Sequence, residues 1–304
     1  MNPQPAQSPP KESVRILLTG IIDYAGVFPP SQISMPEAVA NFAKYQISEF
    51  GWMLGRFVLP VARLGEFLET AEGVAGTSSD GWRLSALASE DIVDTIRRIN
   101  LFNAAHAPRF VCDTVEVKAN TISKIENTVN SLPQDLTAFF EISTDRNFAD
   151  LVATLSIKKQ RAKIRTGGIS NDAFPTSREI IRFVRTCLAA NVPYKATAGL
   201  HHPLRCFKPL TYAENGPQGT MHGFLNLLLM TGFARESFRV QVLEQLMEEE
   251  FEEAFTFEEG GVRYRSDNYI GNAHLGWLRR RGFNSFGSCS FVEPVDDLKE
   301  LGLL

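Results

Sequence analysis

The sequence predicts a (β/α)8 barrel with one long insertion, and three observations support this prediction. Short apolar runs rich in β-branched or aromatic residues recur along the 304 residues, and segments with helical period separate them. This alternation is typical of parallel βαβ units. We count eight such runs, and the chain length suits a barrel with an insertion. An open, doubly wound sheet is the competing architecture.

Each predicted strand corresponds to one apolar run. In chain order the runs are RILLTGIIDY near Arg15, WMLGRFVLP at Trp52, WRLSALA at Trp82, RFVCDTVEVKAN at Arg109, LTAFFEIS at Leu136, AKIRTGG at Ala162, VPYKATAGL at Val192 and FNSFGSCSF at Phe283. Helices are expected after Ser34 and Thr176, because SMPE and TSRE each place a glutamate three residues after a hydroxyl cap. REIIRFVRTCLAA shows one apolar helical face, and EPVDDLKELGLL supplies a last short helix.

Two segments do not fit the barrel repeat. Residues 1–13 are rich in Pro, Ser and Gln, and we expect a disordered tail before one barrel domain of residues 14–304. An insertion of residues from about 201 to 281 separates the last two strands, and it is far longer than a βα connection. It contains GFLNLLLMTGF, an acidic helix RVQVLEQLMEEEFEEAF and a hairpin around FEEGGVRYR. We expect it over the carboxyl-end face, as a lid or a homo-oligomer contact.

Composition narrows the classes of partner. The formal net charge of -4 gives no general attraction for nucleic acid or for an anionic membrane. The longest apolar runs are well short of the roughly 20 residues of a membrane span. The four cysteines are widely spaced and form no CxxC pair, which fits a reducing compartment. We therefore expect a cytoplasmic protein that acts on a small molecule, with no nucleic-acid or membrane partner.

Two lysines lie in apolar, strand-like runs, Lys163 in AKIRTGG and Lys195 in VPYKATAGL. A buried ammonium is costly unless it is paired, loses its proton or does chemistry. Neighbouring strands run about 4.8 Å apart, so we expect the two ammonium groups to approach each other at the barrel mouth. Two like charges lower the pKa of one amine, and a free amine attacks carbonyl groups to form a Schiff base. The second lysine would move protons or stabilise negative charge.

The residues around these lysines resemble a known family. KIRTG from Lys163 matches the K-x-x-T-G pattern of the Schiff-base strand in class I aldolases of the deoxyribose-phosphate aldolase type. KATAG from Lys195 resembles that family's next strand, which carries an accessory lysine, and the separation of 32 positions (195 minus 163) is also similar. The resemblance implies a (β/α)8 barrel that makes or breaks a carbon–carbon bond next to a carbonyl, without a cofactor.

The same resemblance assigns roles on other strands. CDTVEVKAN puts Glu116 where an aspartate of the family helps proton transfer, and FFEIS gives Glu141 a supporting role. IIDYA and FGSCS resemble the first and eighth strands through Asp23 and through Gly287, Ser288 and Ser290.

Other positions depart from the family. Its seventh strand ends in paired glycines and a basic residue, whereas this chain has Ala198, Gly199 and then His201 and His202, and Phe291 replaces a small residue after strand eight. Because these positions hold a substrate phosphate in the family, the departures leave phosphate recognition open. The long insertion indicates a different substrate.

Several of these residues also have simpler interpretations. Lys163 follows a basic stretch that fits a solvated helix end. For Lys195, the simpler interpretation is that its ammonium extends out of the barrel end into solvent. Arg165 alternates with Lys163, so an inward position would let it grip a carboxylate or phosphate, and surface display is the alternative. His201 and His202 point to opposite faces of a strand, so we expect substrate binding or acid–base chemistry rather than a metal site.

Three functional hypotheses follow. The first is an aldolase-like lyase in which Lys163 is the nucleophile, Lys195 lowers its pKa and Glu116 moves protons, with a small carbonyl compound as substrate. The second is a non-covalent enzyme, acid–base or metal-assisted, that acts on a carboxylated or phosphorylated molecule. The third is a barrel without catalytic turnover that binds or assembles through its insertion.

Overall fold

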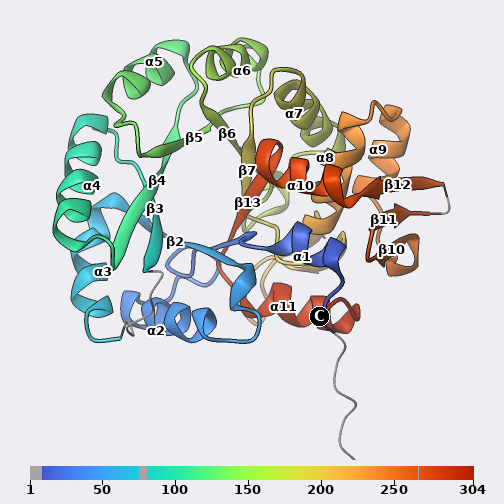
Figure 1. Ribbon diagram of the computed structural model, residues 1–304, viewed down its shortest axis with the longest axis horizontal. Coiled ribbons are helices and arrows are strands. Elements are labelled where there is room, and N and C mark those ends of the chain that lie inside the picture. Colours follow the sequence, from blue (N-terminus) through green and yellow to red (C-terminus); the bar gives the residue numbers. More distant parts are fainter. Residues whose placement is uncertain (1–8, 75–80, 266) are drawn as a thin grey trace, which may run out of the picture.

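Eight parallel strands form a closed barrel in the computed structural model, which describes residues 9–74, 81–265 and 267–304 (Figure 1). The barrel strands are β1 (Ile22–Tyr24), β2 (Leu54–Pro60), β3 (Trp82–Leu87), β4 (Phe110–Lys118), β5 (Thr137–Glu141), β6 (Arg161–Arg165), β7 (Tyr194–Thr197) and β13 (Phe283–Ser288). Their order around the barrel is β1, β13, β7, β6, β5, β4, β3, β2. Seven predicted runs contain one of these strands each, and the sixth run overlaps β6, which begins one residue earlier at Arg161. The (β/α)8 barrel is therefore confirmed, and the open sheet is wrong.

Helices surround the barrel in Figure 1. They are α2 (Met35–Gln46), α3 (Leu64–Ala71), α4 (Ile92–His106), α5 (Ile122–Ser131), α6 (Phe148–Ile157), α7 (Ser177–Ala189), α8 (Phe224–Arg235), α9 (Val240–Met247), α10 (Asn272–Arg281) and α11 (Val292–Glu300). Short 3-10 helices span Gly51–Met53, Val61–Arg63, Asn171–Ala173 and Glu252–Ala254. Both predicted caps are confirmed as helix starts. Thr176 forms the full reciprocal capping box with Glu179, whereas Ser34 accepts from the backbone N–H of Glu37 at 3.3 Å.

The first apolar run holds a helix as well as a strand, which corrects two expectations. Helix α1 (Glu12–Leu18) precedes β1, so Arg15 is helical. Its buried residues include Val14, Leu17 and Leu18, whose spacing of three and four is that of a helical face. The predicted disordered tail is wrong where it overlaps this helix at residues 12 and 13, and residues 1–8 lie outside the described residues.

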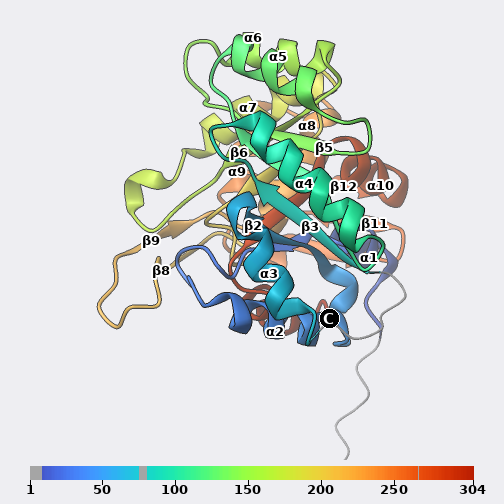
Figure 2. The same ribbon diagram turned by 90° about the vertical axis from the view of Figure 1, so that its left-hand side faces the viewer.

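The insertion lies at both ends of the barrel, which corrects its predicted place over the carboxyl-end face alone. A hairpin of β8 (Cys206–Pro209) and β9 (Gln218–Met221) and a sheet of β10 (Phe255–Glu258), β11 (Gly261–Tyr264) and β12 (Asn268–Gly271) belong to it. Figure 2 shows β8 and β9 on one side of the barrel, and β11, β12 and α1 on the other. The predicted hairpin around FEEGGVRYR is confirmed as β10–β11.

Helix α9 is shorter than the predicted acidic helix. It ends at Met247, and the acidic run that follows leads through a 3-10 turn into β10. Glu249 of that run is buried and accepts a hydrogen bond from the hydroxyl of Tyr264. This acidic residue is therefore shielded from solvent, because β11 packs against it.

Aromatic packing joins the barrel to its helices. The rings of Phe42 on α2, Phe67 on α3 and Trp82 on β3 meet those of Phe57 and Phe110, with centroid separations between 4.9 and 6.0 Å. Such pairs stabilise by about 0.5–1.5 kcal/mol each beyond their buried area. This cluster fixes the middle of β2 and the amino-terminal ends of β3 and β4 against the helix layer.

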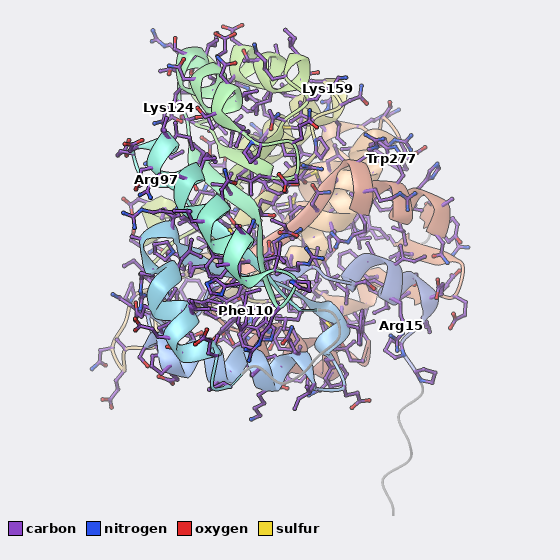
Figure 3. All side chains as sticks on the ribbon, turned by 60° about the vertical axis from the view of Figure 1, so that its left-hand side comes forward. Arg15, Arg97, Phe110, Lys124, Lys159 and Trp277 are labelled. Atoms are coloured by element: carbon purple, nitrogen blue, oxygen red, sulfur yellow. The ribbon has the colours of Figure 1, made fainter. Side chains whose placement is uncertain are left out.

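Charged residues mark the outer surface. Arg97, Lys124 and Lys159 project from the outside of the molecule in Figure 3. Among the described residues, no helix combines the length and the apolar character that crossing a membrane requires.

Candidate active site

A cavity of about 380 Å³ opens at the carboxyl ends of the barrel strands. It is lined by residues at or near those ends, including Leu87, Lys118, Glu141, Arg165 and Thr197. In (β/α)8 barrels this face carries the active site. The cavity is therefore the candidate active site.

Strand register brings the two predicted lysines together. Lys163 on β6 pairs directly with Lys195 on β7, and Glu141 on β5 pairs with Lys163. Their side chains are buried, with 5% exposure for Lys163 and 1% for Lys195. The interpretations that placed either ammonium in solvent are wrong. The prediction that the two lie close together inside the barrel mouth is confirmed.

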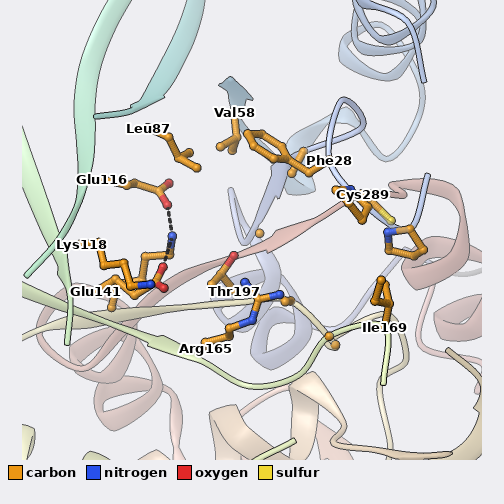
Figure 4. Close-up of a pocket in the computed structure, with 18 of the residues that line it drawn as sticks. Phe28, Val58, Leu87, Glu116, Lys118, Glu141, Arg165, Ile169, Thr197 and Cys289 are labelled. Atoms are coloured by element: carbon orange, nitrogen blue, oxygen red, sulfur yellow. Dashed lines mark ion pairs between the residues drawn. The ribbon is translucent and has the colours of Figure 1, made fainter. Parts of the chain in front are cut away.

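Glu116 on β4 connects the two lysines. Lys163 Nζ lies 2.7 Å from Glu116 Oε2, and Lys195 Nζ lies 2.7 Å from Oε1 of the same carboxylate. Glu141 Oε2 completes the environment of Lys163 at 2.8 Å. Figure 4 shows Glu116 and Glu141 converging, with dashed lines for their ion pairs to Lys163. Ser85 Oγ also donates to Glu116 Oε1 at 2.7 Å.

Asp23 on β1 holds Lys195 from the other side. Lys195 Nζ donates to Asp23 Oδ2 at 2.6 Å, and both side chains are 1% exposed. Ser285 Oγ donates to the same oxygen, and the backbone N–H of Arg56 donates to Oδ1. Lys163 lines the cavity, but Lys195 and Asp23 lie outside its lining, within the part of the chain that the structure describes. Asp23 is therefore a structural partner of Lys195 and not a group on the cavity surface.

The carboxylates reverse the expected shift in lysine pKa. Burial alone would lower the pKa of Lys163, but Glu116 and Glu141 raise it above its ordinary value. Burial would likewise raise the pKa of Glu116, but the two lysines hold it well below its ordinary value. The expectation that Lys195 lowers the pKa of Lys163 is wrong for this resting arrangement, because a carboxylate separates the two ammonium groups.

Two basic side chains stand above this cluster. Arg165 follows Lys163 by two residues on β6, and Lys118 follows Glu116 by two on β4. Both are exposed and both line the cavity, so of the two alternatives for Arg165 the structure shows the inward position, with the side chain still open to solvent. Lys118 was not predicted as a site residue, although the two-residue period from Glu116 contains the signal.

The two histidines at the end of strand seven have different surroundings. His201 lines the cavity, and its Nδ1 lies 3.1 Å from Glu293 Oε2, which also accepts from the Tyr212 hydroxyl at 2.8 Å. His202 lies outside the cavity lining and pairs with Asp297 of α11. Tyr212 and Glu293 could not be found from local patterns, since they lie on the insertion and on the last helix.

The residues predicted on strand eight also separate. Gly287 lines the cavity, whereas Ser288 is buried at 2% exposure and accepts a hydrogen bond from the backbone N–H of Ser290. Cys289 lines the cavity, with the Tyr212 hydroxyl 3.9 Å from its Sγ, and burial raises the pKa of its thiol. This thiol is packed rather than activated.

Within the described ranges, no group of three or more His, Cys, Asp or Glu side chains is arranged to hold a metal ion. Comparisons of the chain with protein-family models, with curated proteins and with solved structures found no match.

Proposed function

We propose that the protein is a lyase that forms or cleaves a carbon–carbon bond next to a carbonyl through a Schiff base on Lys163. One observation carries the proposal: Lys163 lines the cavity while Glu116 and Glu141 contact its ammonium, and Lys195 lies behind the same Glu116. A nucleophilic amine needs access to substrate and a neighbour that accepts its proton. Both conditions are met at Lys163.

Formation of the Schiff base begins with proton transfer, since the raised pKa keeps Lys163 protonated at rest. In the proposed step, Nζ gives one proton to Glu141, and its electron pair attacks the carbonyl carbon. A second proton from Nζ and the proton held by Glu141 are then transferred to the former carbonyl oxygen, which leaves as water. The resulting iminium carries the same single positive charge as the starting ammonium. The carboxylates that stabilise the resting lysine therefore also stabilise the intermediate.

Cleavage then uses the iminium as an electron sink. The bond between the carbon next to the imine carbon and the following, hydroxyl-bearing carbon breaks, and its electron pair forms the double bond of a neutral enamine. The hydroxyl on the departing carbon gives up its proton and becomes a carbonyl. Glu116 takes this proton through a water and later returns it to the enamine carbon, after which hydrolysis frees Lys163. The same steps in reverse make the bond.

The pairing of Glu116 with two cations suits this role. While both lysine nitrogens are charged, the pKa of Glu116 is held low and its carboxylate is a weak base. When the iminium becomes a neutral enamine, one of the two cations is lost. The pKa of Glu116 then rises at the step that requires a base. Lys195 is a positioning residue, because it holds Glu116 without lining the cavity.

Hydrogen exchange next to a carbonyl tests the proposal without knowledge of the full substrate. A Schiff base acidifies the neighbouring C–H group, so the protein should accelerate deuterium incorporation into a carbonyl compound in D2O, measured by proton NMR. The panel should contain uncharged, carboxylated and phosphorylated ketones. Lys163→Arg is the matched variant, because it keeps a cation beside Glu116 and Glu141 but forms no Schiff base.

The possible results separate the three functional hypotheses. Exchange that is lost in Lys163→Arg, with circular dichroism unchanged, supports the covalent mechanism. Exchange that persists in this variant overturns it and favours non-covalent acid–base chemistry. Exchange with none of the panel also contradicts the proposal and favours a barrel that only binds.

A further inference from the structure

The cavity has a cationic side and an apolar side. Arg165 and Lys118 lie at the carboxyl ends of β6 and β4, while Phe28, Val58 and Leu87 line the cavity. Figure 4 shows these three apolar side chains across the cavity from Arg165. The order of strands agrees, since β2, which carries Val58, is four places from β6 around the barrel. A ligand in this cavity meets charge on one side and hydrocarbon on the other.

The two cations are held one step above the lysine–carboxylate cluster. Residues two apart on a strand point to the same face, so Arg165 projects on the side of Lys163 and Lys118 on the side of Glu116. Two residues of strand advance by about 6.7 Å toward the cavity mouth. A small molecule whose carbonyl reaches Lys163 therefore passes beside Arg165 and Lys118.

Neither cation is used within the protein, as far as its described residues go. The side chains of Arg165 and Lys118 form no hydrogen bond or ion pair with any of them, whereas Arg56 lower on β2 is paired with Asp113 at 2.6 Å. Gly168 lies beside the Arg165 guanidinium, and a Cβ built on this glycine would stand 3.5 Å from Nη2. The donors of Arg165 thus remain available at the cavity wall.

The formal charges of the site explain why two further cations are needed for an anionic ligand. Asp23, Glu116 and Glu141 face only two ammonium groups, which leaves one net negative charge beneath the cavity. That charge repels an anion. Arg165 and Lys118 change the total to one net positive charge, which matches a single carboxylate better than a phosphate monoester carrying about −1.5 to −2.

We propose that the substrate is an oxo acid, whose carboxylate is bound by Arg165 and Lys118 while its carbonyl reaches Lys163. The inference rests on the proposed function and adds the substrate class. The planar guanidinium presents two parallel N–H donors to a carboxylate, and the Lys118 ammonium adds a point charge. The carbon chain beyond the carbonyl lies against Phe28, Val58 and Leu87.

Three probes with exchangeable hydrogens test this substrate class: 2-oxobutyrate, uncharged 2-butanone and hydroxyacetone phosphate. Deuterium exchange gives KM and kcat for each, and calorimetry gives the Kd of 2-oxobutyrate. We expect Arg165→Gln to weaken the binding of 2-oxobutyrate by about 10- to 100-fold, because one charge-assisted contact is lost. The change should fall mainly on KM, and the values for 2-butanone should stay within twofold. Arg185→Gln, which removes the same charge from the exposed face of α7, is the matched control.

The results distinguish this inference from the proposed function. Exchange of 2-butanone that depends on Lys163, with no preference for 2-oxobutyrate, retains the lyase and overturns the oxo acid. A preference for hydroxyacetone phosphate also overturns it. Binding of 2-oxobutyrate that weakens in Arg165→Gln, without exchange, retains the carboxylate site and overturns the lyase. Equal Kd values for the wild type and Arg165→Gln contradict the inference directly.

Discussion

Removing the ammonium of Lys195 is the sharpest structural perturbation of the site. Lys195→Met keeps much of the side-chain volume but removes the contacts of Nζ to Asp23 at 2.6 Å and to Glu116 at 2.7 Å. Asp23, whose side chain is 1% exposed, then has lost the ammonium that pairs with it. Breaking one partner of a buried ion pair costs about 3–5 kcal/mol of unfolding free energy. Asp23→Asn should cost less, about 1–3 kcal/mol, because Lys195 keeps Glu116.

The double variant measures the interaction itself. The double variant Asp23→Asn with Lys195→Met removes both charges. Its loss of unfolding free energy should therefore be smaller than the sum of the losses in the two single variants by about 1–3 kcal/mol. Urea unfolding with a shared slope gives all four free energies. The exposed pair of Arg63 and Glu66, also 2.6 Å apart, is the control and should couple by about 0.2–1 kcal/mol. Single losses at Asp23 and Lys195 that add within about 0.5 kcal/mol would refute the reasoning.

Three further predictions concern pH, reactivity and helix capping. The ionised Glu116 stabilises the fold at pH values above its ordinary pKa of 4.5, and this contribution is lost as pH falls through its lowered pKa in the folded protein. In Glu116→Gln, the free energy of unfolding measured with urea should therefore depend less on pH in the acid range. Burial raises the pKa of Cys206 to about 11 and also raises that of Cys289. Thiol reagents at about pH 7.5 should therefore react with both cysteines much faster after denaturation than in the native protein. Rapid labelling of Cys289 in the native protein would contradict its packing. Thr176→Ala should cost about 1 kcal/mol in urea unfolding, and no change would count against its cap.

The barrel was predictable because its signals are local. Each strand is a short apolar run, and consecutive parallel strands place Lys163 beside Lys195 without further information. The first run was predicted as a strand alone, although Val14, Leu17 and Leu18 have helical spacing and only the end of RILLTGIIDY is a strand. Because the run is apolar throughout, its pattern does not show the boundary at Gly20. Gly20 adopts a φ of 58°, which ends the helix.

The protonation of the site was not predictable from the same signals. Its carboxylates come from β1, β4 and β5, and only the closed barrel brings Asp23, Glu116 and Glu141 onto two lysines. A sequence pattern that pairs Lys163 with Lys195 contains the repulsion between them but not the carboxylate that lies between. The placement of the insertion was missed for a similar reason, because contacts with α1 and α11 are remote in sequence.

The most direct test of the covalent mechanism is reduction of the intermediate. Borohydride added to the protein with 2-oxobutyrate or 2-butanone should fix the substrate to the chain, and peptide mass mapping should place the added mass on Lys163. Lys195, which lies behind Glu116, and the exposed Lys159 should stay unmodified. No adduct at saturating carbonyl compound, or an adduct spread over exposed lysines, would contradict the proposed mechanism.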